Sequence, residues 1–388
     1  MQAHGAKGPV RVVMLGPAGA GMFDAFMAGH PQGGVLQSWQ WGELRRHQHW
    51  EPFRLLALDA DGVPCGGASV LCRPLPIGGS LLYVARGPVL DYRDGRTLDA
   101  LVSALRRLGV ACRAVLCKID PPVAPPDPLI ARALRSRGFT VGHRRGRFGG
   151  MQPLRNVIVP LDGGADAVLA RCHAKTRYNI RLAARREVTV RQGRREDLPA
   201  FHRLLMITCD RNGFAERSLP YFQQVWDALA RAGMIELHLA EFQGEPLAAG
   251  ILFALGRHAI YAYGASADTH REVMAPYAVQ WSMMRSACAR GCLRYDMTGV
   301  PLKLEEGEPA YGLYRFKRGF WPEITEFLGE MDLPLQPALY RLWQVAEPAW
   351  WGGQVWVRHQ LREAQELRAR LPFPAPGPAQ LAGSARAR

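Results

Sequence analysis

Ile235-Glu-Leu-His-Leu-Ala-Glu241 and Pro246-Leu-Ala-Ala-Gly-Ile-Leu-Phe253 are two largely apolar stretches on either side of the turn Gln243-Gly-Glu245. Their length, and the glycine between them, predict two antiparallel strands joined as a hairpin. The following segments are predicted to be a strand over His258–Tyr263, a helix over Tyr277–Arg290 and a strand over Arg294–Met297. A meander of strands followed by a helix and another strand is typical of a mixed α/β domain.

The same order of elements is predicted earlier in the chain. A helix over Gln37–Arg45, with Ser38 as its cap, precedes a meander, a second helix and a closing strand. The expected strands are Phe53–Leu58, Gly67–Leu71, Leu81–Val84 and Ala114–Ile119, and the second helix is Leu98–Leu108. Three more helices are expected at Ala165–Arg186, Leu198–Cys209 and Leu219–Arg231. No repeat is visible residue by residue, so the duplication rests on element order alone.

Length and charge limit the classes of function. The chain has 388 residues, enough for two domains, and is 48% hydrophobic, which excludes a disordered chain. Its formal net charge of +15 favours a polyanionic partner such as nucleic acid, a diphosphate or anionic lipid. An arginine skew that reflects codon composition would give the same charge.

Targeting and metal signals are missing from the sequence. No stretch approaches the roughly 18 apolar residues of a membrane span, and the first residues lack the apolar core of a signal peptide. The cysteines form no CxxC pair with histidines behind it, so free thiols are expected rather than metal ligands. We therefore expect a cytoplasmic protein without a metal.

Short blocks of aromatic, glycine and charged residues follow one another along most of the chain. They are Gln37-Ser-Trp-Gln-Trp-Gly42, Tyr83-Val-Ala-Arg-Gly-Pro-Val-Leu-Asp91, Lys118-Ile-Asp-Pro-Pro122, Lys175-Thr-Arg-Tyr-Asn-Ile-Arg181, Thr208-Cys-Asp-Arg-Asn-Gly-Phe214, Tyr261-Ala-Tyr-Gly-Ala-Ser266, Tyr295-Asp-Met-Thr-Gly-Val-Pro301 and Gly312-Leu-Tyr-Arg-Phe-Lys-Arg-Gly-Phe320. In this order they resemble the signature blocks of the Fem-type (FemABX-like) aminoacyltransferases that build peptidoglycan bridges. The resemblance implies an α+β (mixed α/β) chain of two tandem GNAT-like acyltransferase domains.

The resemblance also implies where the domains begin and end. The first domain is expected at 1–157 and, after the second domain at 158–322, again at 323–370. Residues 371–388 are rich in proline, alanine, glycine and arginine, and are expected to be a disordered tail. Some family members carry a long coiled-coil arm in the second domain. Here Lys175–Arg186 leads almost directly into Val188 without heptads, so the chain resembles the compact, armless members.

The reaction implied by the resemblance is aminoacyl transfer. Glycine, alanine or serine would move from aminoacyl-tRNA to the stem-peptide amine of UDP-MurNAc-pentapeptide or of a lipid-linked peptidoglycan precursor. Because the aminoacyl ester is already activated, the chemistry asks for positioning and hydrogen-bond donors, and no cofactor is expected. A monomer is expected, in the cytoplasm, with peripheral contact at the inner face of the membrane.

Candidate catalytic residues follow from the same resemblance. Lys317 resembles the catalytic-site lysine of the family and is expected to stabilise the oxyanion or the tRNA 3′ end, with Phe316 shaping the pocket beside it. The alternative is a solvated lysine in the basic run Arg315–Arg318. Asp91 is expected to orient or deprotonate the amine, and a turn-capping aspartate is the equal alternative.

Candidate precursor-binding residues are cationic and aromatic. Arg211 matches a family position implicated in precursor binding, and Arg45 stands where the family has a phosphate-binding lysine. Tyr83 and Tyr263 are candidates for lining the precursor groove, or else core tyrosines with satisfied hydroxyls.

A basic helix is the candidate tRNA surface. Lys175, Arg177, Arg181 and Arg185 recur at helical spacing, and closely spaced like charges favour a nearby anion such as tRNA phosphate. A solvated face, or salt bridges to acids elsewhere, is the alternative. No aromatic interleaving is recognised here, so sequence-specific base readout is not expected.

Two other functions stay open. An acyl-CoA-dependent N-acyltransferase of the same fold would grip the CoA pyrophosphate with backbone N–H groups of a glycine-rich turn. The corresponding turn, Arg271–Tyr277, has no glycine, and Pro276 has no N–H to donate. A non-catalytic protein that binds RNA or a membrane surface would use the net charge without depending on Lys317.

Overall fold

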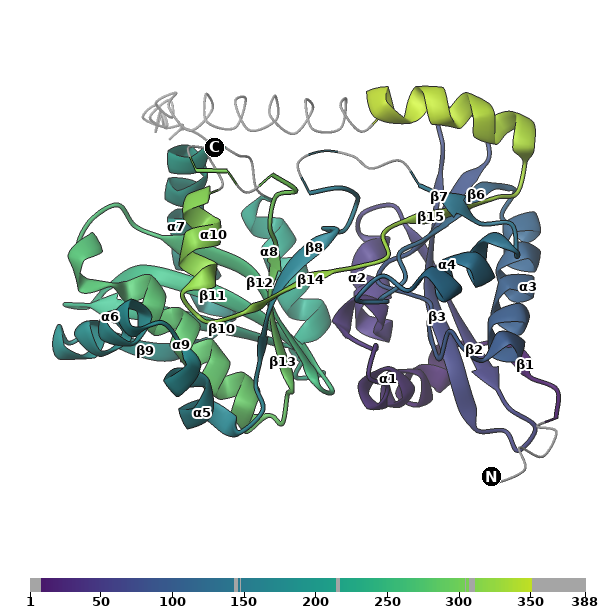
Figure 1. The fold of residues 1–388 in the computed structure, drawn as a ribbon. Helices are drawn as coiled ribbons and strands as arrows, with labels where there is room; N and C mark the ends of the chain where they lie inside the picture. The colour runs from purple at the N-terminus through teal and green to yellow at the C-terminus, as the bar shows by residue number, and fades with distance from the viewer. Residues whose placement is uncertain are drawn as a thin grey trace, which may run out of the picture. The chain divides into compact units, whose positions relative to one another are not determined.

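Two β-sheets of mixed strand direction organise the fold (Figure 1). A computed structural model describes residues 8–142, 146, 148–213, 217–303, 305–306 and 311–350, so the expected tail at 371–388 lies outside it. The first sheet has the strand order β1-β2-β3-β4-β6-β15-β7, with β5 paired to β3. The second has the order β14-β8-β13-β12-β11-β10-β9. Both sheets belong to one unit, Met1–Leu342, and Trp343–Arg388 is assigned to another.

The first sheet and its helices come mostly from the first third of the chain. The strands are β1 (Arg11–Met14), β2 (Glu51–Leu58), β3 (Pro64–Pro74), β4 (Ser80–Val84), β5 (Val89–Leu90), β6 (Ala114–Ile119), β7 (Thr140–Val141) and β15 (Met331–Pro334). The helices are α1 (Ala20–Gly29), α2 (Trp39–Arg46), α3 (Gly95–Ala111) and α4 (Pro128–Arg135).

The second sheet carries more helices. Its strands are β8 (Arg155–Pro160), β9 (Thr189–Gly193), β10 (Ile235–Phe242), β11 (Glu245–Leu255), β12 (His258–Ser266), β13 (Arg294–Gly299) and β14 (Glu323–Glu326). Its helices are α5 (Gly164–Arg171), α6 (Ala174–Arg185), α7 (Leu198–Asn212), α8 (Leu219–Leu229), α9 (Ala275–Ala289) and α10 (Tyr311–Arg318).

Local sequence signals explain several of these elements. β6 has the predicted bounds, and Ser38 caps α2 by accepting a hydrogen bond from the Trp41 N–H at 3.1 Å. The β10–β11 hairpin turns at Gln243 and Gly244, which both have positive φ, as a tight two-residue turn requires. These predictions are confirmed.

The single helix predicted over Ala165–Arg186 is wrong, because the chain breaks into α5 and α6 at Cys172 and His173. Both residues have extended backbone angles, and the His173 N–H donates to the Gly319 carbonyl at 2.9 Å instead of continuing the helix. A distant segment therefore ends α5, which a local pattern does not reveal. α6 runs to Arg185 and β9 begins at Thr189, so no arm separates them.

Two strands lie on the other side of the expected domain boundaries. β8, whose first residues fall before 158, and β14, at Glu323–Glu326, both belong to the second sheet, where they pair with each other. The chain returns to the first sheet only at β15, which pairs antiparallel with β6. Figure 1 shows this return as the yellow-green segment that follows α10.

One apolar core joins the two halves. Val35 and Leu44, which flank and belong to α2, are fully buried in a cluster formed otherwise by α7, α8 and the second sheet. The Trp41 ring meets Phe253 of β11 edge-on, with ring centroids 6.0 Å apart. Since burial of such side chains contributes about 1.5–3 kcal/mol each, α2 is held firmly against the second sheet.

A buried ion pair fastens β15 to β6. Lys118 Nζ lies 2.5 Å from Asp332 Oδ1 and 3.6 Å from Glu330 Oε2, and none of these side chains is more than 7% exposed. Tyr340 donates its hydroxyl proton to Asp332 Oδ2 at 3.1 Å. The desolvation cost of burying these charges is offset only while they are paired.

We expect Lys118→Met to lower the free energy of unfolding by roughly 3–5 kcal/mol, because it leaves two carboxylates buried without their cation. Urea denaturation measures this, with the exposed Lys303→Met as control. The double variant Lys118→Met/Asp332→Leu is expected to regain part of the loss. Equal stability of Lys118→Met and Lys303→Met would contradict a structural role for the pair.

Candidate functional site

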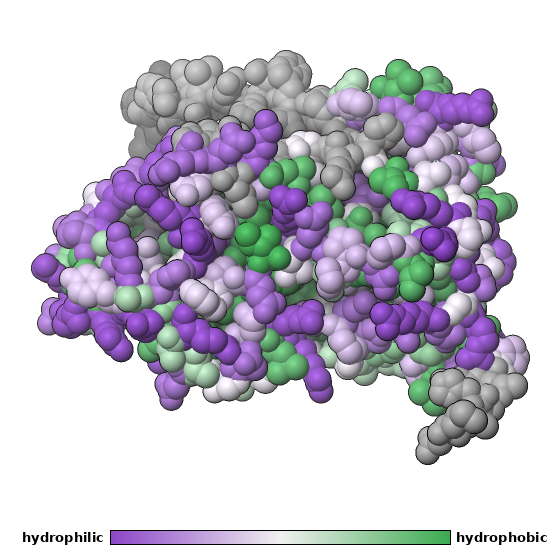
Figure 2. Space-filling view, viewed as in Figure 1, coloured by the Kyte–Doolittle hydropathy of each residue, from purple (hydrophilic) through white to green (hydrophobic). Residues whose placement is uncertain are grey.

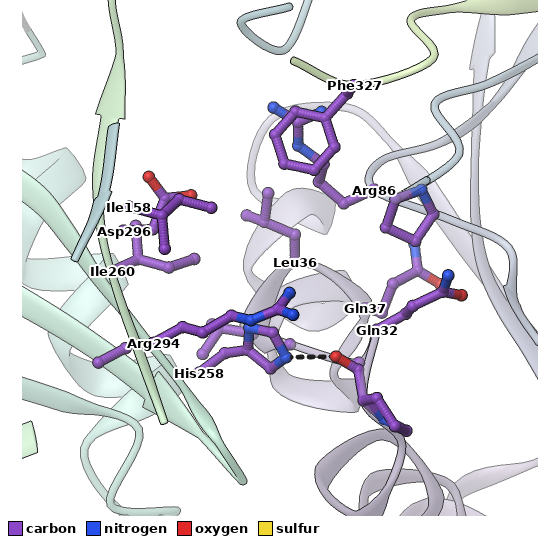
Figure 3. A pocket seen from close by; sticks show the side chains of 16 residues that line it. Gln32, Leu36, Gln37, Arg86, Ile158, His258, Ile260, Arg294, Asp296 and Phe327 are labelled. Atoms are coloured by element: carbon purple, nitrogen blue, oxygen red, sulfur yellow. Dashed lines mark hydrogen bonds between the residues drawn. The ribbon is translucent and has the colours of Figure 1, made fainter. Parts of the chain in front are cut away.

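A pocket lies between the two sheets (Figure 3). Gln32, Leu36 and Gln37 line it from the segment before α2, and Arg86 and Phe327 form a second wall. The second sheet contributes Ile158, His258, Ile260, Arg294 and Asp296. In Figure 3 the Arg294 side chain reaches from the second sheet toward the middle of the pocket. The pocket is thus built by residues far apart in the sequence.

Arg86 connects the two halves at one wall of this pocket. Its guanidinium lies 3.9 Å from the centroid of the Phe327 ring, within the range of a cation–π contact. One terminal nitrogen donates to the Pro153 carbonyl at 2.6 Å and the other to Asp120 Oδ1 at 3.4 Å. Arg86 is therefore held by Asp120 and Pro153, which precede the second sheet in the chain, and by Phe327, which follows it.

Lys317 is buried beside the second sheet. The side chain, in the last turn of α10, is 2% exposed, so it is not the solvated lysine of the alternative interpretation. Its Nζ donates to the Gly299 carbonyl at 2.9 Å and to Thr298 Oγ1 at 3.4 Å. Both acceptors lie at the end of β13, and Thr298 has a positive φ of 65°. No carboxylate of the described residues forms an ion pair with Lys317 within 4.0 Å.

Burial tunes the proton affinity of this lysine. Desolvation lowers the pKa of Lys317 to about 8, and the nearby charge of Asp296 opposes the shift. Burial also raises the pKa of Asp296, although its carboxylate accepts hydrogen bonds from Asn156 Nδ2 and the Thr298 N–H, both at 2.6 Å. Because Asp296 also lines the pocket, it links the pocket to Lys317. A buried cation whose pKa is lowered by desolvation is typical of a functional site.

Lys317 lies between an aromatic cluster and the end of β13, where β13 has separated from β12. Phe316 packs against Tyr277 and Phe320, with ring centroids 5.0 and 5.4 Å away. The parallel pairing of β12 with β13 covers only His258–Ile260 and Arg294–Asp296. Beyond it the two strands no longer pair, and Lys317 bonds to β13 in this unpaired part.

Arg45 and three tyrosines gather at the other end of α2. Arg45 is close enough to Tyr83, Tyr221 and Tyr263 to interact electrostatically with each, and burial lowers its pKa. Its guanidinium lies 5.6 Å from the centroid of the Trp50 ring, and its buried Nε has no hydrogen-bond partner among the described residues. One terminal nitrogen of Arg45 donates to Gln48 Oε1. A half-buried arginine among aromatic rings is suited to binding an anion.

The tyrosines of this group differ in their hydrogen bonds. The hydroxyls of Tyr221 and Tyr263 lie 3.0 Å apart, whereas the fully buried Tyr83 hydroxyl is within hydrogen-bonding reach of the Gln152 side chain. Burial raises the pKa of Tyr83 well above its ordinary value. Sequence analysis missed Tyr221 and Trp50, since Tyr221 fits the pattern of an ordinary amphipathic helix and no motif contains Trp50.

Asp91 and Arg211 have local partners. Asp91 is exposed, and its Oδ1 accepts a hydrogen bond from the Arg93 N–H at 2.9 Å, as a turn-capping aspartate would. Arg211, on α7, pairs with Asp268 and donates to Ser266 Oγ at 2.9 Å, at the end of β12. No hydrogen bond in the described structure connects either residue to Lys317 or Arg45.

The basic helix α6 has one inward and several outward cations. Arg177 donates to the Ala170 and Cys172 carbonyls at the end of α5. Lys175, Arg181 and Arg185 are exposed, and no carboxylate of the described residues pairs with them. The salt bridges of the alternative interpretation are therefore not formed there.

The segment before α9 is arranged as the sequence indicated. A turn at Arg271–Val273 leads into α9, and Pro276 lies in its first helical turn. This end of the helix offers one N–H fewer than a glycine-rich turn would.

Comparison with known proteins places this architecture in a family. Residues 20–243 and 235–348 match the model of the FemAB family. The chain belongs to the FemAB family. The lipid II:glycine glycyltransferase of Staphylococcus aureus (strain USA300) is 26% identical over an alignment of 412 residues, which covers 87% of this chain and 97% of the relative. The predicted family is thus confirmed.

Solved structures confirm the fold class. The crystal structure of FemX superimposes with a TM-score of 0.80 at 26% identity, covering 85% of this chain and 99% of that one. The structure of L-PGS from Bacillus licheniformis has a TM-score of 0.50 at 13% identity over 84% of this chain and 95% of its own, a likeness of fold alone. The alignment with the glycyltransferase is longer than this FemAB-family chain, so residues of the relative lack counterparts here.

Two further features are absent from the described residues. No helix among them is long and apolar enough to cross a membrane. No group of three or more histidine, cysteine, aspartate or glutamate side chains in the same residues is placed to hold a metal ion.

We expect Lys317→Met to leave the FemAB fold as stable as the wild type, or more stable, near pH 7. The pKa of Lys317 is lower in the folded chain, about 8, than its ordinary value of 10.5, so the unfolded chain binds more protons between these values. The free energy of unfolding of the wild type should therefore rise through this pH window, by on the order of 3 kcal/mol, relative to the variant. Thermal denaturation of both proteins from pH 7 to 10.5 measures the difference, and parallel curves would contradict it.

Proposed function

We propose that this FemAB-family protein is an aminoacyltransferase that moves an amino acid from aminoacyl-tRNA to the stem-peptide amine of a peptidoglycan precursor. The observation that carries the proposal is Lys317, a buried cation coupled through Asp296 to a pocket between the two sheets. The similarity to a glycyltransferase over almost the whole of that relative supports the class of reaction.

In the proposed reaction the neutral acceptor amine attacks the ester carbonyl of the aminoacyl-tRNA. A C–N bond forms, the C–O bond to the ribose breaks, and the proton leaving the amine is transferred to the ribose oxygen. Lys317 stabilises the negative charge that develops on the carbonyl oxygen or at the tRNA 3′ end, and Phe316, the residue before it, excludes water from its surroundings. No residue is assigned as general base, because Asp91 is exposed and no hydrogen bond of the described residues connects it to Lys317.

The group formed by Arg45, Tyr83, Tyr221 and Tyr263 is the proposed precursor site. The Arg45 guanidinium would receive the diphosphate, and the tyrosines beside it would line the groove for the sugar. Because the relative is a lipid II:glycine glycyltransferase, we favour a lipid-linked precursor over the UDP-linked form. Such a substrate would bring the protein, as a monomer, to the inner face of the membrane. Arg211 would act at the rim of this site.

The acyl-CoA alternative is disfavoured by the segment before α9. The turn has no glycine, and Pro276 removes a backbone donor from the first turn of the helix. The non-catalytic alternative does not explain why a lysine is kept buried at the cost of its solvation.

Transfer of radiolabelled glycine, alanine and serine from charged tRNA to each precursor form tests the proposal. Label should enter the precursor with wild type and fall roughly a hundredfold with Lys317→Met, the cost of removing one such donor. Acylation of amines from labelled acetyl-CoA, without transfer from any charged tRNA, would overturn the proposal.

The pH profile of transfer should have an alkaline limb near pH 8. Lys317 is cationic below its pKa of about 8 and loses its stabilising charge as the pH rises through that value. Initial rates, corrected for uncatalysed ester hydrolysis, measure the limb. The residual activity of Lys317→Met should lack it, and an unchanged limb in this variant would assign it to another group.

Arg45→Gln should raise KM for the precursor while leaving kcat within a few fold, because binding and not chemistry is altered. The matched control is Arg46→Gln, which removes the next residue of α2, an exposed arginine paired with Glu43 and Glu51. Equal KM values for the two variants would place the diphosphate elsewhere.

A further inference from the structure

Trp321 is an exposed tryptophan in an unusual backbone conformation. It follows α10, is 56% exposed and has a φ of 56°, in the left-handed region that bulky residues rarely adopt. Its N–H donates to the Arg318 carbonyl at 3.1 Å, which holds it in the turn after the helix of Lys317. Neither burial nor a relaxed backbone explains a tryptophan here, and such outliers tend to cluster at functional sites.

The Trp321 ring lies beside the first residues of α6. It lies against the imidazole of His173, the residue just before α6, with ring centroids 5.1 Å apart. Tyr178 of α6 is 55% exposed, and the Arg185 guanidinium lies 5.5 Å from its ring centroid. We call His173, Lys175, Tyr178, Arg181, Arg185 and Trp321 the basic-aromatic strip.

The periodicity of α6 places the helical members of this strip on one side. At about 100° per residue, Lys175, Tyr178, Arg181 and Arg185 fall within roughly a third of the helix circumference. The opposite side is buried and carries Thr176, Asn179, Ile180 and Ala183. Sequence analysis recognised no aromatic residues among these cations. That interpretation is wrong, because Tyr178 lies on the same face and the fold adds Trp321.

The strip is positively charged without counterions from the protein. The exposed Lys175, Arg181 and Arg185 form no ion pair with the described residues, whereas Arg191 and Arg195 nearby in the sequence do. Figure 2 shows mostly hydrophilic residues over the part of this face where Figure 1 places α6.

We propose that the basic-aromatic strip binds the unpaired 3′ end of the donor nucleic acid, with bases stacked on Trp321 and Tyr178 and phosphates near Lys175, Arg181 and Arg185. This proposal rests on the proposed function, since it assumes an aminoacyl-tRNA donor. Aromatic platforms beside cations are how proteins hold single-stranded nucleic acid without reading its sequence, and each stacked base contributes about 1–3 kcal/mol.

The position of the strip suits this role. Trp321 follows Lys317 by one turn of chain, and His173 is bonded through its N–H to Gly319, between the two. A strand bound along α6 and over Trp321 would therefore arrive at the helix that carries the candidate catalytic lysine. A lipid surface is less suited, because membrane-binding helices expose an apolar face, and the apolar side of α6 is buried in the protein.

Binding of a short single-stranded RNA ending in CCA, measured by fluorescence anisotropy with the full-length protein, tests the strip without requiring transfer. Trp321→Ala should weaken binding between roughly fivefold and a hundredfold, and Trp321→Phe should retain most of it. The triple variant Lys175→Gln/Arg181→Gln/Arg185→Gln loses three phosphate contacts. The slope of log K against log salt concentration should therefore fall in magnitude by about 2. The control is the triple variant Arg107→Gln/Arg132→Gln/Arg135→Gln, which changes three exposed arginines of α3 and α4.

The outcomes separate this proposal from the proposed function. Unchanged RNA binding in Trp321→Ala, with wild-type transfer intact, would overturn the strip alone. Failure of wild-type transfer would overturn the function, and the RNA titration would still report on the strip. Three other results would each overturn the strip. The two triple variants could have equal effects, or the protein could prefer duplex RNA of equal length. Trp321 could also be needed for binding to phosphatidylglycerol vesicles instead of RNA.

Discussion

The packing of α2 against the second sheet is the constraint on which the site depends. Leu44 and Val35 are buried in a core formed by helices and strands of the second half, and Trp41 meets Phe253 there. Because Arg45 follows Leu44 directly, burying the leucine also presents the arginine to Tyr221 and Tyr263. Apolar packing of one short helix thus brings a cation of the first half to aromatic residues of the second.

Two buried lysines have different consequences in the same fold. Lys118 is matched by Asp332 and Glu330 and fastens the returning strand β15. Lys317 is bonded to a carbonyl and a hydroxyl, and desolvation brings its pKa to about 8. A paired buried charge serves stability, whereas one whose charged form is disfavoured is held ready to interact with a substrate.

The candidate site consists of two groups of residues, both located where the two sheets and their helices meet. Arg86, Asp296 and Arg294 surround the pocket of Figure 3, whereas Arg45 and the tyrosines lie at the C-terminal end of α2. Tyr83 and Arg86, three residues apart around the end of β4, connect these groups. An acceptor bound by its diphosphate near Arg45 would have its peptide directed along this connection, which is the arrangement that a transfer between two large substrates requires.

The sequence by itself determined the family, the fold class and most of the regular elements, because ordered motifs, hydrophobic periodicity and local caps such as Ser38 are properties of neighbouring residues. It also indicated Lys317 and Arg45. Only the tertiary structure decided that Asp91 accepts a hydrogen bond within its own turn and that α5 ends where His173 bonds to Gly319. It also decided that Tyr221 meets Tyr263 and that Trp321 lies against His173. The physical reason is that burial, desolvation and the meeting of distant strands depend on contacts between residues far apart in the chain, which no local pattern encodes.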